Sequence, residues 1–94
     1  MSTLADGEAA GSTAAVGAAI FGRRPVAEIM FDNLLALCAD ELHNQAGKFH
    51  YLSGGQINVP MVIRTPHGGG RGYAGQHSQC LESICTHMPG LIVV

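Results

Sequence analysis

Tryptophan is absent from this chain, and charged residues are scarce. Only 13% of its 94 residues are Asp, Glu, Lys or Arg, whereas 47% are hydrophobic. A chain this short is at most one domain, and it buries a limited fraction of its surface. We therefore expect apolar surface that is covered by more protein, either from the same chain or from a partner.

A basic patch is also missing. The net charge is −2, and Arg23 and Arg24 are the one adjacent pair of cations. Proteins that bind nucleic acid usually carry clustered Lys and Arg on one face. The composition therefore argues against a nucleic-acid partner.

Paired cysteine motifs are lacking as well. The chain has three cysteines, an odd number, and no CxxC. This favours reduced thiols in a bacterial cytoplasm or an organelle matrix over a disulfide framework. A zinc site is an alternative, but zinc ligands usually come in tighter pairs, so we expect no metal. The residues considered for it are His77, Cys80, Cys85 and His87.

No apolar run is long enough to span a membrane. The Ala- and Gly-rich segment 9–22 is about 14 residues long, whereas a bilayer needs about 20. We do not expect it to be a signal peptide either, because acidic Asp6 and Glu8 stand where a basic region would precede it. We expect a helix there, with Gly11 and Gly17 allowing close approach of another backbone.

The hydrophobic periodicities predict alternating helices and strands. Gly22 should end the first helix, and Asp32 or Asn33 should cap the second. Glu28 lies inside a run that we expect to be buried, so it should need a partner, and the register of Phe31 places that side chain in the core. This order predicts an α/β fold, part of a doubly wound and mainly parallel sheet that is incomplete at this length. The expected elements are helices over 8–21, 32 to about 51 and 78–87, and strands over 26–31, 59–63 and 91–94.

A glycine-rich segment follows the second expected strand. Five glycines lie within the nine residues after Pro66. The segment lacks the Lys-Ser/Thr of a phosphate-binding loop, so we interpret it as a flexible crossover. His77 comes next, at the expected start of a helix beyond a strand end, where α/β sheets bind ligands. An imidazole suits proton transfer there; the alternative is a histidine that satisfies local backbone groups.

Four blocks of this sequence resemble the β subunit of the thiamine-diphosphate-dependent 2-oxoacid dehydrogenases, a group that includes the pyruvate, branched-chain 2-oxoacid and acetoin dehydrogenase complexes. The blocks are VGAAIFGRRPVAEIMF (16–31), NQAGKFHYLSGGQ (44–56), VPMVIRTP (59–66), and QHSQ with the following PGL-x-VV (76–94). They occur in the family's order. The resemblance implies a transketolase-like pyrimidine-binding domain, of which residues 1–94 are a part, because the family's subunit is much longer.

The resemblance also implies roles for three residues. Glu8 lies eight residues before Val16, matching the glutamate that hydrogen-bonds N1′ of the cofactor's aminopyrimidine. A carboxyl group there can share the N1′ proton; the alternative is an acidic residue favoured near a helix N-terminus. His77 matches the histidine of QHSQ, which hydrogen-bonds or protonates the oxoacid carbonyl or later species. Leu34 replaces an aromatic that stacks on the pyrimidine, a loss of about 1 kcal/mol.

The implied activity is oxidative decarboxylation of a 2-oxoacid, with pyruvate favoured, or conversion of acetoin. The implied cofactor is thiamine diphosphate, with Mg²⁺ held mainly by an α subunit in an α₂β₂ assembly. The acyl group would pass to the lipoyl group of an acyltransferase component. Two alternatives stay open: a non-catalytic binding or assembly fragment, which Leu34 and the short length favour, and another transketolase-like thiamine-diphosphate enzyme.

Overall fold

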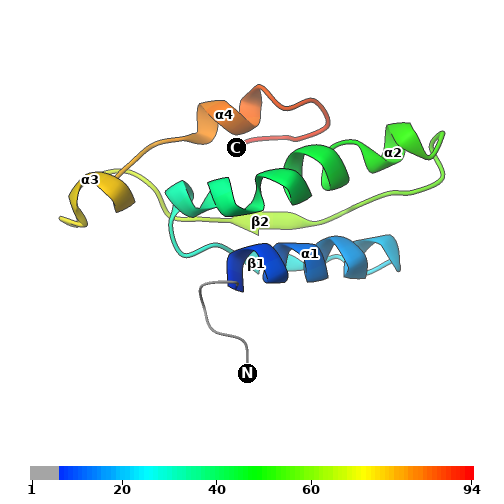
Figure 1. Cartoon of the computed structure of the whole chain (residues 1–94), viewed down its shortest axis with the longest axis horizontal. Helices are drawn as coiled ribbons and strands as arrows, with labels where there is room; N and C mark the ends of the chain where they lie inside the picture. Colours follow the sequence, from blue (N-terminus) through cyan, green and yellow to red (C-terminus); the bar gives the residue numbers. More distant parts are fainter. Residues whose placement is uncertain (1–6) are drawn as a thin grey trace.

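A computed structural model of the chain describes residues 7–94. Its elements are α1 (Gly7–Ile20), β1 (Val26–Glu28), η2 (Asp32–Cys38), η3 (Glu41–Ala46), α2 (Phe49–Leu52), β2 (Val62–Arg64), α3 (Ala74–His77) and α4 (Glu82–Thr86). Element η2 is a 3₁₀ helix and η3 is a π-helix. With α2 they form one long, irregular helical run beside the strands (Figure 1). The predicted α/β class is confirmed.

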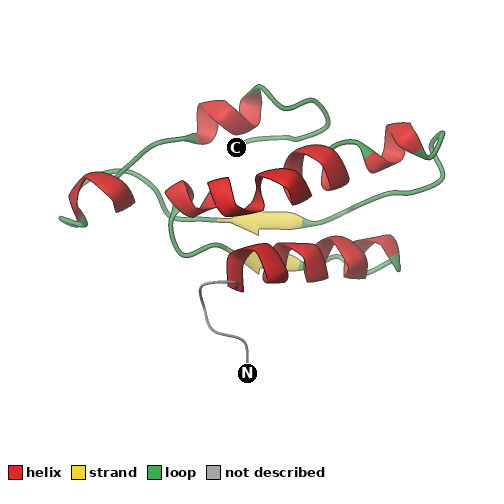
Figure 2. Cartoon of the chain, viewed as in Figure 1, coloured by secondary structure: helices red, strands yellow, loops and turns green. Residues whose placement is uncertain are grey.

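The two strands form a parallel sheet, as the sequence predicts (Figure 2). Val26 pairs with Val62, and Glu28 pairs with Arg64. The pairing continues beyond the strands, because the Asp32 amide donates to the Pro66 carbonyl at 3.1 Å. Both strands point toward the end of the molecule where α3 lies (Figure 1). That end is therefore the carboxyl edge of the sheet.

The core lies between the helices and one face of the sheet. Helix α1 packs against η2, η3 and β1. The molecule measures 44 × 34 × 18 Å, and 18 Å leaves room for two layers only. The register partners Val26 and Val62 are 67% and 55% exposed, so the outer sheet face carries the exposed apolar surface that we expected. The buried apolar residues are Ala15, Val16, Ala19, Ile29, Cys38 and Leu42.

Gly22 ends α1 as predicted. Its φ is +85°, and its amide donates to the Ala19 carbonyl at 2.9 Å. The next amide, of Arg23, donates to Ala18 at 3.0 Å. These bonds occupy carbonyls that the last turn of a helix leaves free.

Two glycines let distant segments touch through their backbones. Gly90 follows α4 with a φ of +89°, and Gly47 links η3 to α2. A Cβ placed on Gly90 would lie 2.1 Å from the Gly47 carbonyl oxygen, and one on Gly47 would lie 2.9 Å from the Pro89 carbonyl oxygen. The turn at Pro89 and Gly90 therefore packs directly on the backbone of Gly47, and the contact leaves no room for a side chain at either glycine.

The carboxyl-terminal predictions are partly wrong. In place of one helix over 78–87 there are two short helices, α3 and α4, separated by a four-residue link. His77 is consequently the last residue of α3 and not the start of a helix. Residues 91–94 are not a strand, because no strand in the described part of the chain pairs with them; Leu91 packs against the core instead. Both strands are also shorter than predicted.

The caps and the expected core position of Phe31 are wrong too. Phe31 is the N-cap of η2 and makes no side-chain capping bond within residues 7–94, so neither Asp32 nor Asn33 is the cap. Phe31 is half-buried and lies outside the core. Among the described residues, nothing lies within 4 Å of a Cβ built on Gly11 or Gly17, where we expected a neighbouring backbone.

Glu28 has the partner that the sequence suggested it needs. Its carboxylate accepts a hydrogen bond from Arg64, its register partner. Both side chains are exposed, at 61% and 73%, so the expected burial of Glu28 is wrong. The pair contributes little stability in water.

None of the helices formed by residues 7–94 is long and apolar enough to cross a membrane.

Candidate functional site

A pocket of about 420 Å³ lies at the carboxyl edge of the sheet. Its wall comes from the segments that follow β1 and β2, the glycine-rich loop and α3. Ligand sites of open α/β sheets occur at this edge. The lining residues are Met30, Phe31, Pro66, His67, Gly68, Gly69, Arg71, Tyr73 and His77.

His77 is held from two sides in this pocket. Its ring stacks on Phe31, with centroids 4.3 Å apart and planes 11° apart. Its Nδ1 lies 3.1 Å from Oδ1 of Asn33. Because an amide oxygen only accepts, Nδ1–H is the donor and Nε2 is the nitrogen left free for other partners. Phe31 meets Tyr73 edge-on, at 5.2 Å and 68°, which completes an aromatic wall.

Asp32 anchors the segment that carries this histidine. Its side chain is buried, and its Oδ2 accepts from the Leu81 amide at 2.9 Å. The Gly68 amide donates to the Gln79 carbonyl at 2.8 Å and ties the glycine-rich loop to the same segment. These bonds take backbone groups that a continuous helix over 78–87 would need, which explains why that helix is broken. Sequence reasoning predicted only a capping role for Asp32, so this tertiary role was missed.

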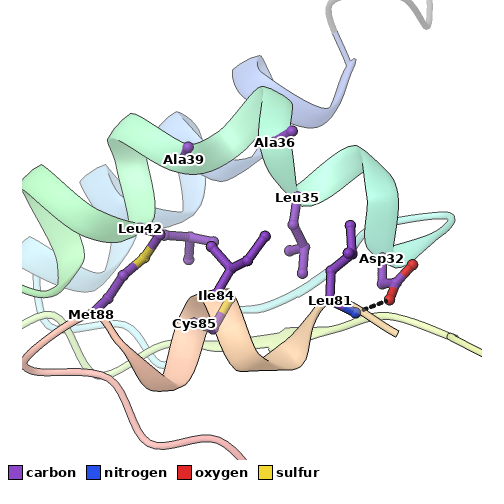
Figure 3. Close-up of a pocket in the computed structure, with 9 residues that line it drawn as sticks. All are labelled: Asp32, Leu35, Ala36, Ala39, Leu42, Leu81, Ile84, Cys85 and Met88. Atoms are coloured by element: carbon purple, nitrogen blue, oxygen red, sulfur yellow. Dashed lines mark hydrogen bonds between the residues drawn. The ribbon is translucent and has the colours of Figure 1, made fainter. Parts of the chain in front are cut away.

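A second cleft, of about 200 Å³, lies between the η2–η3 run and α4 (Figure 3). Asp32 and its bond to Leu81 stand at one end, and the side chains of Leu42 and Ile84 face each other further along. Cys85 lines it too, and burial raises the pKa of that thiol. We interpret this cleft as a packing gap, since its lining is almost wholly apolar.

Glu8 and Leu34 lie outside the His77 pocket as far as the described residues show. Glu8 is half-buried in the first turn of α1, which is the end of that helix nearer to α3 (Figure 1). Leu34 is partly buried against the core cluster that contains Cys38. Burial raises the pKa of the Cys38 thiol, and the charges of Glu41 and Glu8 add to this rise. The roles expected for Glu8, Leu34 and His77 stay predictions.

The metal ligands considered from the sequence do not gather as a group among residues 7–94. A different set does: His67, Cys80 and Glu82 have ligand atoms within 4.8 Å of one another. All three are exposed, and His67 and Glu82 approach only to 4.0 Å. Exposed groups this loosely spaced do not make a metal site by themselves, and we assign none.

Comparison with known proteins places this chain in a family. The family model described as the transketolase pyrimidine-binding domain matches residues 7–94. The chain is 51% identical, over 81 residues, to the acetoin:2,6-dichlorophenolindophenol oxidoreductase β subunit of Cupriavidus necator, covering 86% of this chain and 24% of that protein. It is 48% identical to two mitochondrial pyruvate dehydrogenase E1 β subunits: β-1 of Oryza sativa, over 79 residues (84% and 21%), and that of Homo sapiens, over 80 residues (85% and 22%). The chain thus spans under a quarter of the length of these relatives. It belongs to the transketolase pyrimidine-binding domain family.

Proposed function

We propose that this chain is the pyrimidine-binding part of the β subunit of a thiamine-diphosphate-dependent 2-oxoacid or acetoin dehydrogenase component. Residues 1–94 would form part of that domain. The observation that carries the proposal is the placement of His77, stacked on Phe31 in a pocket at the carboxyl edge of the sheet, in a chain of this family. The dehydrogenase β subunits among the relatives support the same assignment.

The pocket's chemistry fits the substrate end of the bound cofactor, and the aminopyrimidine itself would lie against Glu8 and Leu34, which are not among the lining residues. Phe31, Tyr73 and Met30 offer flat or flexible apolar surface, and about 420 Å³ falls within the range of small-molecule pockets. Arg71 is the one permanently charged cation of the lining, too little for a diphosphate with its metal. We therefore assign Mg²⁺ and the diphosphate mainly to the partner α subunit. When bound, the cofactor supplies a carbon nucleophile that amino-acid side chains lack.

Two residues of this chain would handle protons. Glu8 would hold the proton at N1′ of the aminopyrimidine, and Leu34 would give apolar contact to the ring. Nε2 of His77 would hold or deliver a proton at the substrate's carbonyl oxygen. Positioned acid–base groups of this kind contribute about 10²- to 10⁴-fold in rate.

Substrate and partners follow from the same proposal. We propose an α₂β₂ assembly that passes an acyl group to the lipoyl group of an acyltransferase component, in a bacterial cytoplasm or an organelle matrix. The described cysteines are all free, which suits such a compartment. The relatives at 51% and 48% identity are named for acetoin and for pyruvate, so identity does not choose between those substrates.

The test is cofactor binding by the complete β subunit mixed with its α subunit. Titration calorimetry should show thiamine diphosphate binding that needs both subunits and Mg²⁺. Turnover should then be measured with pyruvate, branched-chain 2-oxoacids and acetoin, using an artificial electron acceptor. Absence of binding would favour the alternative, a non-catalytic assembly fragment; ketol transfer between sugars would favour a transketolase-like enzyme.

A further inference from the structure

The hydrogen bond between Asn33 and His77 joins residues 44 positions apart in the chain. We propose that Asn33 is a positioning residue: it fixes the orientation of the His77 imidazole and, in the neutral ring, keeps the proton on Nδ1, so that Nε2 is the nitrogen that takes up a proton and delivers it at the substrate. The proposal rests on the function proposed above. It adds Asn33, for which sequence reasoning suggested only a possible capping role.

The local structure explains why His77 needs such support. Helix α3 has four residues, and no side chain caps its start within the described part of the chain. A single exposed turn is marginal in water and holds a side chain poorly. The ring is instead held by η2 and the residue before it: Phe31 sets the plane of the imidazole, and Asn33 sets its rotation within that plane.

Asn33 is itself held firmly. Its neighbour Asp32 is 2% exposed and is bonded through its amide to Pro66 and through its carboxylate to Leu81. The first bond fixes the start of η2 to the exit of β2, and the second fixes it to the segment after His77. The amide of Asn33 therefore projects from a braced backbone, as the supporting shell of an active-site group requires.

The Asn33 side chain offers an uncharged hydrogen-bond acceptor to Nδ1 of His77. A neutral imidazole has two tautomers, and an acceptor at Nδ1 selects the form with Nδ1–H. An uncharged acceptor orients the ring without holding the proton as strongly as a carboxylate would. The other ionisable groups of the pocket are His67, Arg71 and Tyr73, and the Asp32 carboxylate is turned to Leu81. None of the ion pairs among the described residues involves His77.

The first test uses the complete enzyme with Asn33→Leu and Asn33→Asp. Leucine removes the acceptor at similar size, so kcat/KM should fall about 10-fold or more while cofactor affinity stays unchanged. Aspartate adds a charge that favours the imidazolium, so the pH–rate profile should move up by about one unit. Asn44→Leu and Asn44→Asp are matched controls, because Asn44 is exposed on η3 and bonds Asp40 and Lys48; they should leave the profile in place.

A double-mutant cycle separates positioning from structure. If Asn33 acts through His77, Asn33→Leu should cost nothing further in the His77→Ala background. An equal loss in both backgrounds would overturn the proposal, and so would a pH profile that Asn33→Asp leaves in place.

A readout without activity keeps the two proposals distinct. Solid-state ¹⁵N spectra of the sedimented enzyme, labelled at histidine and assigned with His77→Gln, should show the Nδ1–H tautomer, and Asn33→Leu should mix the tautomers. An Nε2–H tautomer in the unaltered protein, or no change on Asn33→Leu, would overturn the role of Asn33. Failure to bind thiamine diphosphate would overturn the proposed function, and the spectra would still decide the role of Asn33.

Discussion

Replacing Gly90 by alanine should destabilise this region more than replacement of other glycines. Two effects add at this position. An alanine at a φ of +89° costs about 1–2 kcal/mol, because its Cβ crowds the backbone. The new Cβ would also lie 2.1 Å from the Gly47 carbonyl oxygen, so the two backbones must part by more than about 1 Å to restore ordinary contact. Such overpacking typically costs about 1–3 kcal/mol, which gives a total of about 3 kcal/mol.

Two other glycines isolate the contributions. Gly54 has a φ of +64° and nothing within 4 Å of a built Cβ, so Gly54→Ala should show the backbone cost alone, about 1 kcal/mol. Gly17 is helical and equally open, so Gly17→Ala should stabilise by about 1 kcal/mol through helix propensity. The series therefore contains one variant with backbone strain and a steric contact, one with backbone strain alone, and one with neither.

Native-state hydrogen exchange, read by mass spectrometry on the complete protein, measures these changes locally. Peptides spanning residues 41–52 and 82–94 should report a lower free energy of opening in Gly90→Ala, since the exchange rate follows local stability. If Gly90→Ala costs no more than Gly54→Ala, the direct contact between the two backbones is not present in solution.

Four further predictions concern the site, the thiols and the isolated chain. Glu8→Gln in the complete enzyme should slow hydrogen–deuterium exchange at C2 of the bound cofactor about 10²-fold or more without changing thermal unfolding, because the amide cannot share the N1′ proton; an unchanged exchange rate would reject the role. His77→Ala should lower oxoacid turnover about 10²-fold with little change in cofactor affinity; full activity combined with dissociation into subunits would make His77 an interface residue. Burial raises the pKa of Cys38 and Cys85, so both should be alkylated by iodoacetamide at pH 8 more slowly than exposed Cys80, as peptide mass spectrometry would show; equal rates would contradict the burial. The 94-residue chain alone should aggregate, because its two-stranded sheet has open edges and an exposed apolar face; a monodisperse, cooperatively melting monomer would contradict this.

Local sequence was enough to predict some of the fold. The first helix with its stop at Gly22 and the parallel pairing of two strands follow from helix propensity, a glycine signal and apolar runs. The helix over 78–87 was predicted wrongly, because tertiary hydrogen bonds occupy backbone groups of this segment. Asp32 accepts from the Leu81 amide, and the Gly68 amide donates to the Gln79 carbonyl. Residues 91–94 have the composition of a strand, but a strand also needs a partner, and no local pattern reveals whether one is present.

The candidate site, too, was predicted from the sequence only in part. His77 was found through a motif, and its pocket at the carboxyl edge follows from α/β topology. Phe31 and Asn33 contact it from 46 and 44 residues away, respectively. Periodicity placed Phe31 in the core, because apolar alternation cannot distinguish a core side chain from a pocket wall. The Asp-Asn pair after a strand was the available signal, and it also fits a helix cap.

The winding of η2 sets how far Asn33 reaches. A 3₁₀ helix rises about 2.0 Å per residue and an α-helix about 1.5 Å, so the five steps from Asn33 to Cys38 span about 2.5 Å more in the 3₁₀ form. Lengthening the 3.1 Å contact between Asn33 and His77 by that amount would take it well beyond hydrogen-bond distance. If η2 relaxed to α-helix with its Cys38 end held in the core, its start would draw back from α3 and the hydrogen bond would break. The 3₁₀ helix η2 thus acts as a spacer. A change that altered its winding would move the Asn33 amide relative to the His77 ring, even if it contacted no residue of the pocket.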